Sequence, residues 1–189
     1  SYDYKDRING NNNIVPVYLA DTSYNLADSY VTDDFYGMLE DSEGTMFPSH
    51  TLEIATGRIP VSSQQQAKDV VDKILRDYNV DSFGDWRNTI TLLADDIDDP
   101  SDITIQPGVE TIADDIKANK PIFNVNKIYA DAYIQQNSSG GERYPDVKAA
   151  ITRAIETGTL VFDYFGHGGE DGFAAERFLD IPQIKGFKN

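Results

Sequence analysis

The sequence contains no cysteine, which excludes a disulfide scaffold, a thiolate zinc site and a thiol nucleophile supplied by its own residues. It has no apolar run near the roughly 20 residues that cross a bilayer, so we expect no transmembrane segment. Basic residues are scarce: 16 Lys and Arg stand against 32 Asp and Glu, which gives a net charge of −16. Because such a charge repels a phosphate backbone, nucleic acid is not an expected partner.

The 189 residues are 40% apolar and 25% charged, a composition that can bury the core of a globular domain. From residue 52 onward, β-prone runs alternate with segments whose apolar residues recur at helical spacing. The pattern predicts strands at 52–55, 89–94, 125–129 and 159–165, a helix that begins after Ser62 or Ser63, helices around 109–116 and 144–155, and a surface loop at 135–141. Such alternation is typical of βαβ crossovers. We therefore predict an α/β fold with a mainly parallel sheet and helices on both faces.

Two parts of the chain are expected to differ in role. Residues 1–60 are interpreted as part of an N-terminal subdomain, and residues 61–189 as an α/β part that carries a candidate histidine. The first residues read as the middle of a domain, so we expect the chain to be a fragment of a longer protein.

Only two histidines are present, and their surroundings differ. His50 lies in a predicted loop with no neighbouring carboxylate or glycine, so we interpret it as a surface or structural residue. His167 directly follows the predicted strand 159–165 and lies between Gly166 and Gly168. Glycines let the backbone turn sharply and let a substrate approach the main chain, so the imidazole would be presented at the edge of the sheet. The alternative is an ordinary strand-to-helix turn that contains a histidine.

An acidic pair, Asp95-Asp96, follows the predicted strand 89–94. These carboxylates could orient an imidazole, bind a cation or cap the next helix. Because parallel strands end at the same edge of a sheet, we expect the pair to lie near His167. The other acids are interpreted as solvated or as calcium ligands, although their spacing does not match the twelve-residue calcium loop. No cofactor is expected to be required, and a structural calcium ion is left open.

A histidine and a carboxylate still lack a nucleophile, since there is no cysteine and no Gly-x-Ser-x-Gly elbow. Either the nucleophile lies beyond Asn189, or the chain binds without catalysing. A third interpretation is a phospho-acceptor receiver domain that holds magnesium with an acidic pair. It is disfavoured because the pair follows the third predicted strand, after those at 15–19 and 52–55, and no lysine ends the strand 159–165.

Residues 162–170 (FDYFGHGGE) resemble the histidine strand of the gingipain-type cysteine peptidases, a branch of the caspase-like clan. Segments 57–61 (GRIPV), 84–88 (GDWRN) and 93–96 (LADD) have counterparts in the same order. The resemblance covers essentially the whole chain. It implies a caspase-like sheet that is incomplete at its C-terminal end.

The resemblance implies a role for each matching residue. His167 would be the catalytic histidine, the Gly168 amide would contribute to the oxyanion hole, and Asp96 would orient the imidazole, with Asp95 as the alternative. The family's catalytic cysteine ends the strand after the histidine strand, and residues 174–187 look like the connection to that strand. The chain alone is therefore expected to be inactive.

Within the family, the nearest resemblance is to the cell-surface, sortase-like signal peptidases of the type IX secretion system of Bacteroidota. It rests on residues 1–7, 33–37, 131–133, 141–147 and 168–177. It implies an exported protein at the outer membrane that removes C-terminal sorting domains from secreted cargo and contacts other secretion components. The segment 97–110 departs from the gingipains, so a preference for arginine or lysine is not expected. The alternative is a non-catalytic surface-binding module with the same fold.

Overall fold

The computed structural model describes residues 15, 17–19, 31–43, 50–169 and 171–188, and these form two compact units, Ser1–Arg76 and Asp77–Asn189. Each unit is described by itself. The boundary lies later in the chain than the division at residue 60 that the sequence suggests. Helix α1, Gln64–Asp77, begins where the sequence predicts it, and almost all of it falls in the first unit. None of its residues is buried.

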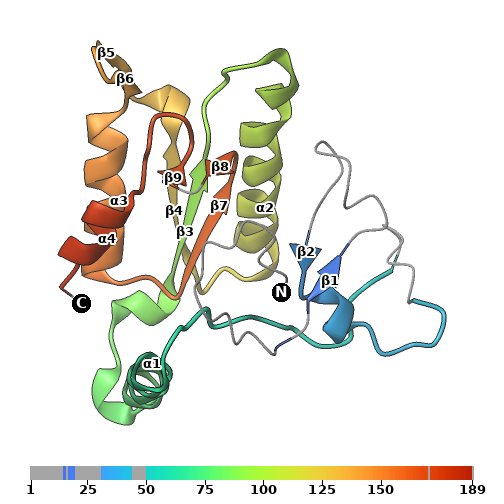
Figure 1. The fold of residues 1–189 in the computed structure, drawn as a ribbon. Coiled ribbons are helices and arrows are strands. Elements are labelled where there is room, and N and C mark those ends of the chain that lie inside the picture. Colours follow the sequence, from blue (N-terminus) through green and yellow to red (C-terminus); the bar gives the residue numbers. More distant parts are fainter. Residues whose placement is uncertain (1–14, 16, 20–30, 44–49, 170, 189) are drawn as a thin grey trace. The chain divides into compact units, whose positions relative to one another are not determined.

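The second unit contains a three-stranded parallel sheet in the order β4-β3-β7 (Figure 1). The strands are β3 Thr89–Ala94, β4 Asn124–Tyr129 and β7 Val161–Phe165, close to the predicted strands. The central strand is almost wholly buried because strands flank it on both sides and helices cover both faces. The structure confirms the predicted α/β fold.

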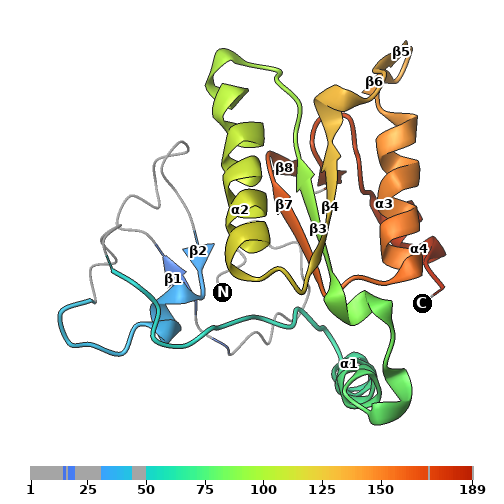
Figure 2. The same cartoon turned by 180° about the vertical axis from the view of Figure 1, so that it is seen from behind.

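Helices α2, Ile105–Asn119, and α3, Pro145–Thr157, cover opposite faces of this sheet (Figures 1 and 2). Neighbouring residues of β3 serve different faces, as the alternation of a strand requires. Leu93 packs with Ile128, Val147 and Ile151 on the α3 side, whereas Leu92 belongs to the α2 side. The two cores fix the central strand, and with it the residues that follow the strand.

Shorter elements complete the described part of the chain. The short strands are β1 Tyr18–Leu19, β2 Val31–Thr32, β5 Gln136–Ser138, β6 Gly141–Arg143, β8 Gly168–Gly169 and β9 Gly172–Phe173. The other helices are α4 Ile181–Gly186 and the 3-10 turns Asp34–Gly37, Val80–Ser82, Asp85–Asn88, Pro100–Thr104 and Ala130–Ala132. None of the described helices combines the length and the apolar character that a membrane span requires.

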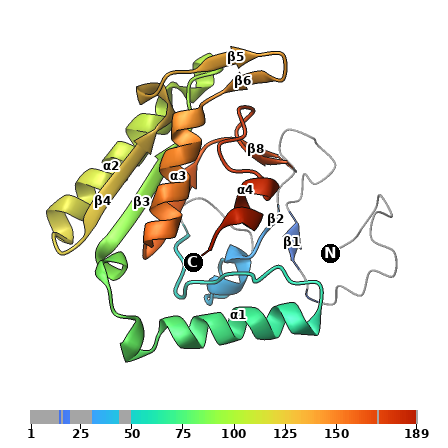
Figure 3. The ribbon, with the colours of Figure 1, turned by 90° about the vertical axis from the view of Figure 1, so that its left-hand side faces the viewer.

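Two local predictions were wrong. Residues 52–55 do not form a strand, because the amides of Glu53 and Ile54 both donate to the carbonyl of Gly37, at 3.0 and 3.4 Å, instead of to a ladder. The predicted loop 135–141 contains most of a hairpin, in which β5 pairs antiparallel with β6. Gly141 takes a φ of 97° there, which glycine adopts without strain. Figure 3 shows this hairpin beyond the carboxyl end of the sheet.

Two segments that carry the family resemblance, residues 33–37 and 57–61, belong to the first unit. Arg58 forks onto Asp33, with Nε donating to Oδ2 at 2.8 Å and a terminal nitrogen donating to Oδ1 at 2.7 Å. This bidentate hydrogen bond holds the pKa of the Asp33 carboxyl below its usual value. The hydroxyl of Thr56 also donates to the Asp33 carbonyl at 3.0 Å. Residues 33–37 and 57–61 therefore meet in the fold.

Candidate active site at the carboxyl edge of the sheet

The carboxyl ends of β3 and β7 lie side by side, since Ala94 pairs with Phe165. The amide of Asp95 donates to the carbonyl of Phe165 at 3.1 Å, which completes the pairing of Ala94 with Phe165. The acidic pair and the glycine-flanked His167 therefore meet at one edge of the sheet, where the active sites of parallel α/β folds gather.

Asp95 holds His167 by its backbone and by its ring. The backbone amide of His167 donates to Asp95 Oδ2 at 2.7 Å, and ring atom Nδ1 lies 3.1 Å from the same oxygen. The Asp95 side chain is only 4% exposed, whereas the imidazole is 64% exposed. A buried carboxylate thus fixes one nitrogen of a ring that is largely open to solvent. Atom Nε2 lies 3.7 Å from Asp102 Oδ1, too far for a hydrogen bond.

The expected contact between Asp96 and the imidazole is absent, and Asp95 takes that place. Asp96 instead accepts a hydrogen bond from the hydroxyl of Tyr144, at 2.9 Å to Oδ2. Asp95 keeps the imidazole because its Oδ2 also accepts the backbone amide of His167, whereas Asp96 turns to the N-terminus of α3, where Tyr144 lies. Burial raises the pKa of Asp96 to about 6.

Gly166 has a steric role that the sequence alone does not reveal. A Cβ added there would lie 2.5 Å from Asp95 Cβ, 2.5 Å from Tyr164 Oη and 2.7 Å from Asp95 Oδ2. The tyrosine hydroxyl donates to the His167 carbonyl at 2.7 Å. Tyr164 is therefore a supporting residue of the site, and no local pattern in the sequence marks it.

Replacing Gly166 by alanine is expected to destabilise the chain by about 2 kcal/mol, because the added methyl group must displace Asp95 or Tyr164. Urea unfolding would measure the loss. Gly169→Ala is the matched control, since no atom of the part of the chain that the structure describes lies within 4 Å of a Cβ at that position. Equal stability of the two variants would contradict this account.

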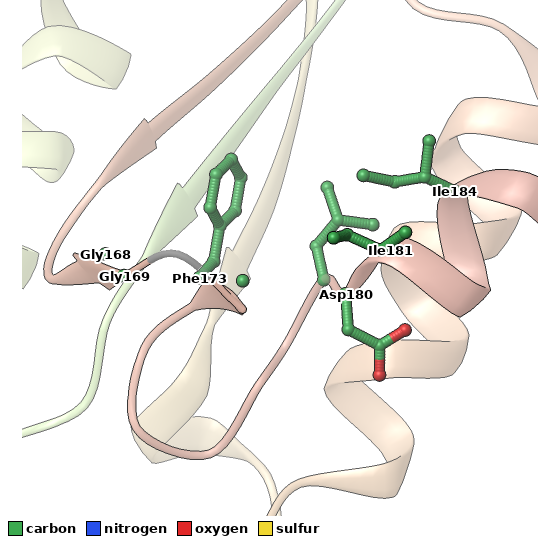
Figure 4. Close-up of a pocket in the computed structure, with 8 residues that line it drawn as sticks. Gly168, Gly169, Phe173, Asp180, Ile181 and Ile184 are labelled. Carbon is green, nitrogen blue, oxygen red and sulfur yellow. The ribbon is translucent and has the colours of Figure 1, made fainter. Parts of the chain in front are cut away.

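Gly168 begins β8, which pairs antiparallel with β9, so that Gly168 faces Phe173. No atom of the described residues lies within 4 Å of a Cβ placed on Gly168, so these residues leave the main chain approachable there. A hollow of about 360 Å³ opens beside it. Figure 4 shows the Phe173 ring on one side of the hollow, with Ile181 and Ile184 on the other. Phe173 is held by stacking on Tyr164, with the ring centroids 4.4 Å apart.

Asp102 and Glu176 are two buried acids near this edge. Asp102, interpreted from the sequence as solvated or as a calcium ligand, closes a capping box in which its Oδ2 accepts from the amide of Asp99 at 2.9 Å. Glu176 was not predicted as a site residue, because its burial depends on the chain folding back after β7. Burial and the negative charge of Asp96 raise the pKa of Glu176 to about 7.

The other histidine, His50, belongs to the first unit and is partly buried.

The raised pKa values of Asp96 and Glu176 predict how stability depends on pH in a buffer free of divalent cations. Folding favours the protonated form of each group, so their stabilisation is complete below the ordinary values near pH 4 and is lost as the pH rises through 6 and 7. We expect the free energy of unfolding to fall by about 3 kcal/mol from pH 5 to pH 8.

Urea unfolding at several pH values between 5 and 8 would measure this slope. The acids with lowered pKa values, such as Asp180, act only below this window and do not mask it. Glu176→Gln is expected to flatten the profile. A stability that rises across the window would contradict the prediction.

Comparison with known proteins gives one match. No protein of curated function and no solved structure shows significant similarity to the chain. The model of peptidase family C25 matches residues 1–189, the whole sequence. The match includes the glycine-flanked His167 and the acidic pair with which it meets. The chain therefore belongs to peptidase family C25, the gingipain family of cysteine peptidases.

Proposed function

We propose that this chain is the histidine-bearing part of a cysteine peptidase active site, with His167 as the catalytic histidine and Asp95 as the residue that orients it. The observation that carries the proposal is the pairing of a buried carboxylate with an exposed ring, 3.1 Å from Asp95 Oδ2 to Nδ1. Because Nδ1 faces Asp95, Nε2 is the nitrogen available to a substrate. The family match supports the reaction class.

The reaction requires a thiolate, which this sequence does not contain. We propose that a cysteine beyond Asn189 attacks the scissile carbonyl and forms an acyl-enzyme. His167 gives a proton from Nε2 to the leaving amine, while the nearby negative charge of Asp95 stabilises the imidazolium. The Gly168 amide donates to the oxyanion. Without the cysteine, the 189-residue chain is inactive.

We further propose that the parent protein is a PorU-like peptidase of the type IX secretion system, exported to the outer membrane and cell surface. Its substrates are secreted proteins with C-terminal sorting domains, and other secretion components are its partners. The amine of a lipopolysaccharide-linked group, in place of water, attacks the acyl-enzyme, so that an amide bond forms and the cysteine thiol is released. The support is the resemblance in residues 1–7, 33–37, 131–133, 141–147 and 168–177.

The test is a parent chain extended past Asn189 through the next strand, treated with a thiol-directed peptidyl probe. We expect labelling of a single cysteine, mapped by mass spectrometry. A fusion that ends in a sorting domain, mixed with a soluble amine, tests the finer proposal: the amine-linked cargo should form and the sorting domain should be released. Labelling of the cysteine without transfer to the amine would support the peptidase proposal and contradict the transfer proposal. An extended chain with no reactive cysteine would favour the surface-binding module.

A further inference from the structure

A cluster of three buried acids lies at the carboxyl edge, and the proposed peptidase mechanism leaves two of them unused. Asp95, Asp96 and Glu176 each offer one carboxylate oxygen, and these three oxygens lie within 4.8 Å of one another. Asp96 is 4% exposed and Glu176 is 3% exposed. The cluster joins the end of β3 to the segment between β9 and α4.

Two oxygens of the cluster have no hydrogen-bond partner among the described residues. They are Asp96 Oδ1 and Glu176 Oε2, and both are buried. Burying a carboxylate oxygen without a hydrogen bond or a counter-charge is costly. Besides burial, the charges that raise the pKa of Glu176 come from Asp96, Asp98 and Asp95, and all three are negative. The neighbouring Arg177 does not neutralise these charges, because its side chain donates to Asp171 Oδ2 at 3.3 Å. A positive charge at this point would satisfy atoms that the described protein residues leave unsatisfied.

We propose that Asp95, Asp96 and Glu176 bind a divalent cation of the calcium type. Three carboxylates form a hard, all-oxygen ligand set. The three oxygens lie within 4.8 Å of one another, close enough to bind one ion. Ca²⁺ takes six to eight oxygen ligands in a flexible geometry, whereas Mg²⁺ usually keeps several waters and is bound through only one or two carboxylates. Asp98 and Glu142 form an adjoining group with Glu176 and add negative charge at its exposed side.

The bound ion would tie the segment between β9 and α4 to the end of β3. That segment supplies Leu179 and Asp180 to the hollow beside Gly168. Because Asp95 also holds the backbone of His167, the ion would stabilise the fold around the candidate active site. Binding of the ion needs no cysteine, so it can be measured separately from peptidase activity. Failure of the metal site would therefore leave the proposed peptidase function untouched, and the reverse also holds.

The experiment measures binding and melting of the 189-residue chain at about pH 8, after treatment with a chelator that is then removed. Calcium is expected to raise the melting temperature by about 5 °C or more at saturation. Magnesium at the same concentration is expected to give a smaller shift. Terbium should bind at the same place and emit when tyrosine is excited, since Tyr144 donates to Asp96 at 2.9 Å. Calcium should displace that emission.

Glu176→Gln is the diagnostic variant, because it removes one ligand charge with little change of shape. It should weaken calcium binding at least about tenfold, yet melt no lower than the parent chain when the metal is absent. Asp114→Asn removes an equal charge from an exposed position of α2 and should keep the full calcium shift. No calcium shift in the parent chain, or an equal shift in Glu176→Gln, would overturn the site. So would a Glu176→Gln chain that melts lower than the parent without metal, since that result means a structural role for the carboxylate.

Discussion

Replacing His167 by alanine in the extended parent chain is expected to slow labelling by the thiol-directed probe about 10³-fold or more, within the range that loss of a catalytic base produces. The imidazole is the group that Asp95 orients and that solvent reaches, with 64% of the side chain exposed. The cysteine would then react only as an ordinary thiol, with a small thiolate fraction at neutral pH. The rate of labelling, measured over time, is the readout.

The same substitution should barely change stability. An exposed side chain contributes little to the core, and Asp95 loses only its contact with the ring while it still accepts the backbone amide, so we expect a cost of about 1 kcal/mol or less. Urea unfolding of the 189-residue chain measures this directly. His50→Ala is the control for the loss of a histidine, and labelling should be unchanged by it. A stability loss well above 2 kcal/mol, or labelling that is indifferent to His167, would make the residue structural.

The sequence predicted the frame of the site well because the frame depends on local and periodic signals. Strand β3 is both β-branched and apolar, and the structure places it at the predicted residues 89–94. The prediction that His167 would meet the acidic pair needed only the rule that parallel strands end at one edge. Because β3 and β7 are neighbours in the sheet, their carboxyl ends bring the acidic pair and His167 together.

The choice between Asp95 and Asp96 could not be read from the sequence. It depends on contacts between segments far apart in the sequence: the His167 amide donates to Asp95, and the Tyr144 hydroxyl donates to Asp96. The roles of Tyr164 and Glu176 were missed for a related reason. Each acts through a contact formed only when the chain after β7 folds back over the sheet edge.

Helix α1 shows a different limit. Its apolar residues recur at helical spacing, and the structure confirms the helix over Gln64–Asp77. Amphipathic spacing predicts that a face can be buried, but it does not say what covers it. In this structure no residue of α1 is buried, so the periodicity predicted the element without predicting a place in the core.

Asparagine in place of Asp95 is expected to change which nitrogen of His167 carries the proton. In the parent chain the carboxylate can only accept, so neutral His167 should keep its proton on Nδ1, which faces Asp95 Oδ2 at 3.1 Å. When the NH₂ group of the asparagine takes the place of Oδ2, it donates to Nδ1 and moves the proton to Nε2, while the hydrogen bond from the His167 backbone amide to that atom is lost. The nitrogen that should serve the substrate would then be blocked, and labelling in the extended chain should fall about 10²–10⁴-fold.

The tautomer can be measured on the 189-residue chain itself, because the sequence has only two histidines. Nitrogen-15 spectra at about pH 8.5, two units above the ordinary pKa of histidine, would report both ring nitrogens of His167, with His50→Gln to assign the signals. Asp114→Asn should leave the spectrum unchanged. Asp96→Asn provides the sharper comparison, since its carboxylate faces Tyr144 instead of the ring. If Asp96→Asn moves the proton and Asp95→Asn does not, the orienting role returns to Asp96 and the geometry at the end of β3 must differ in solution.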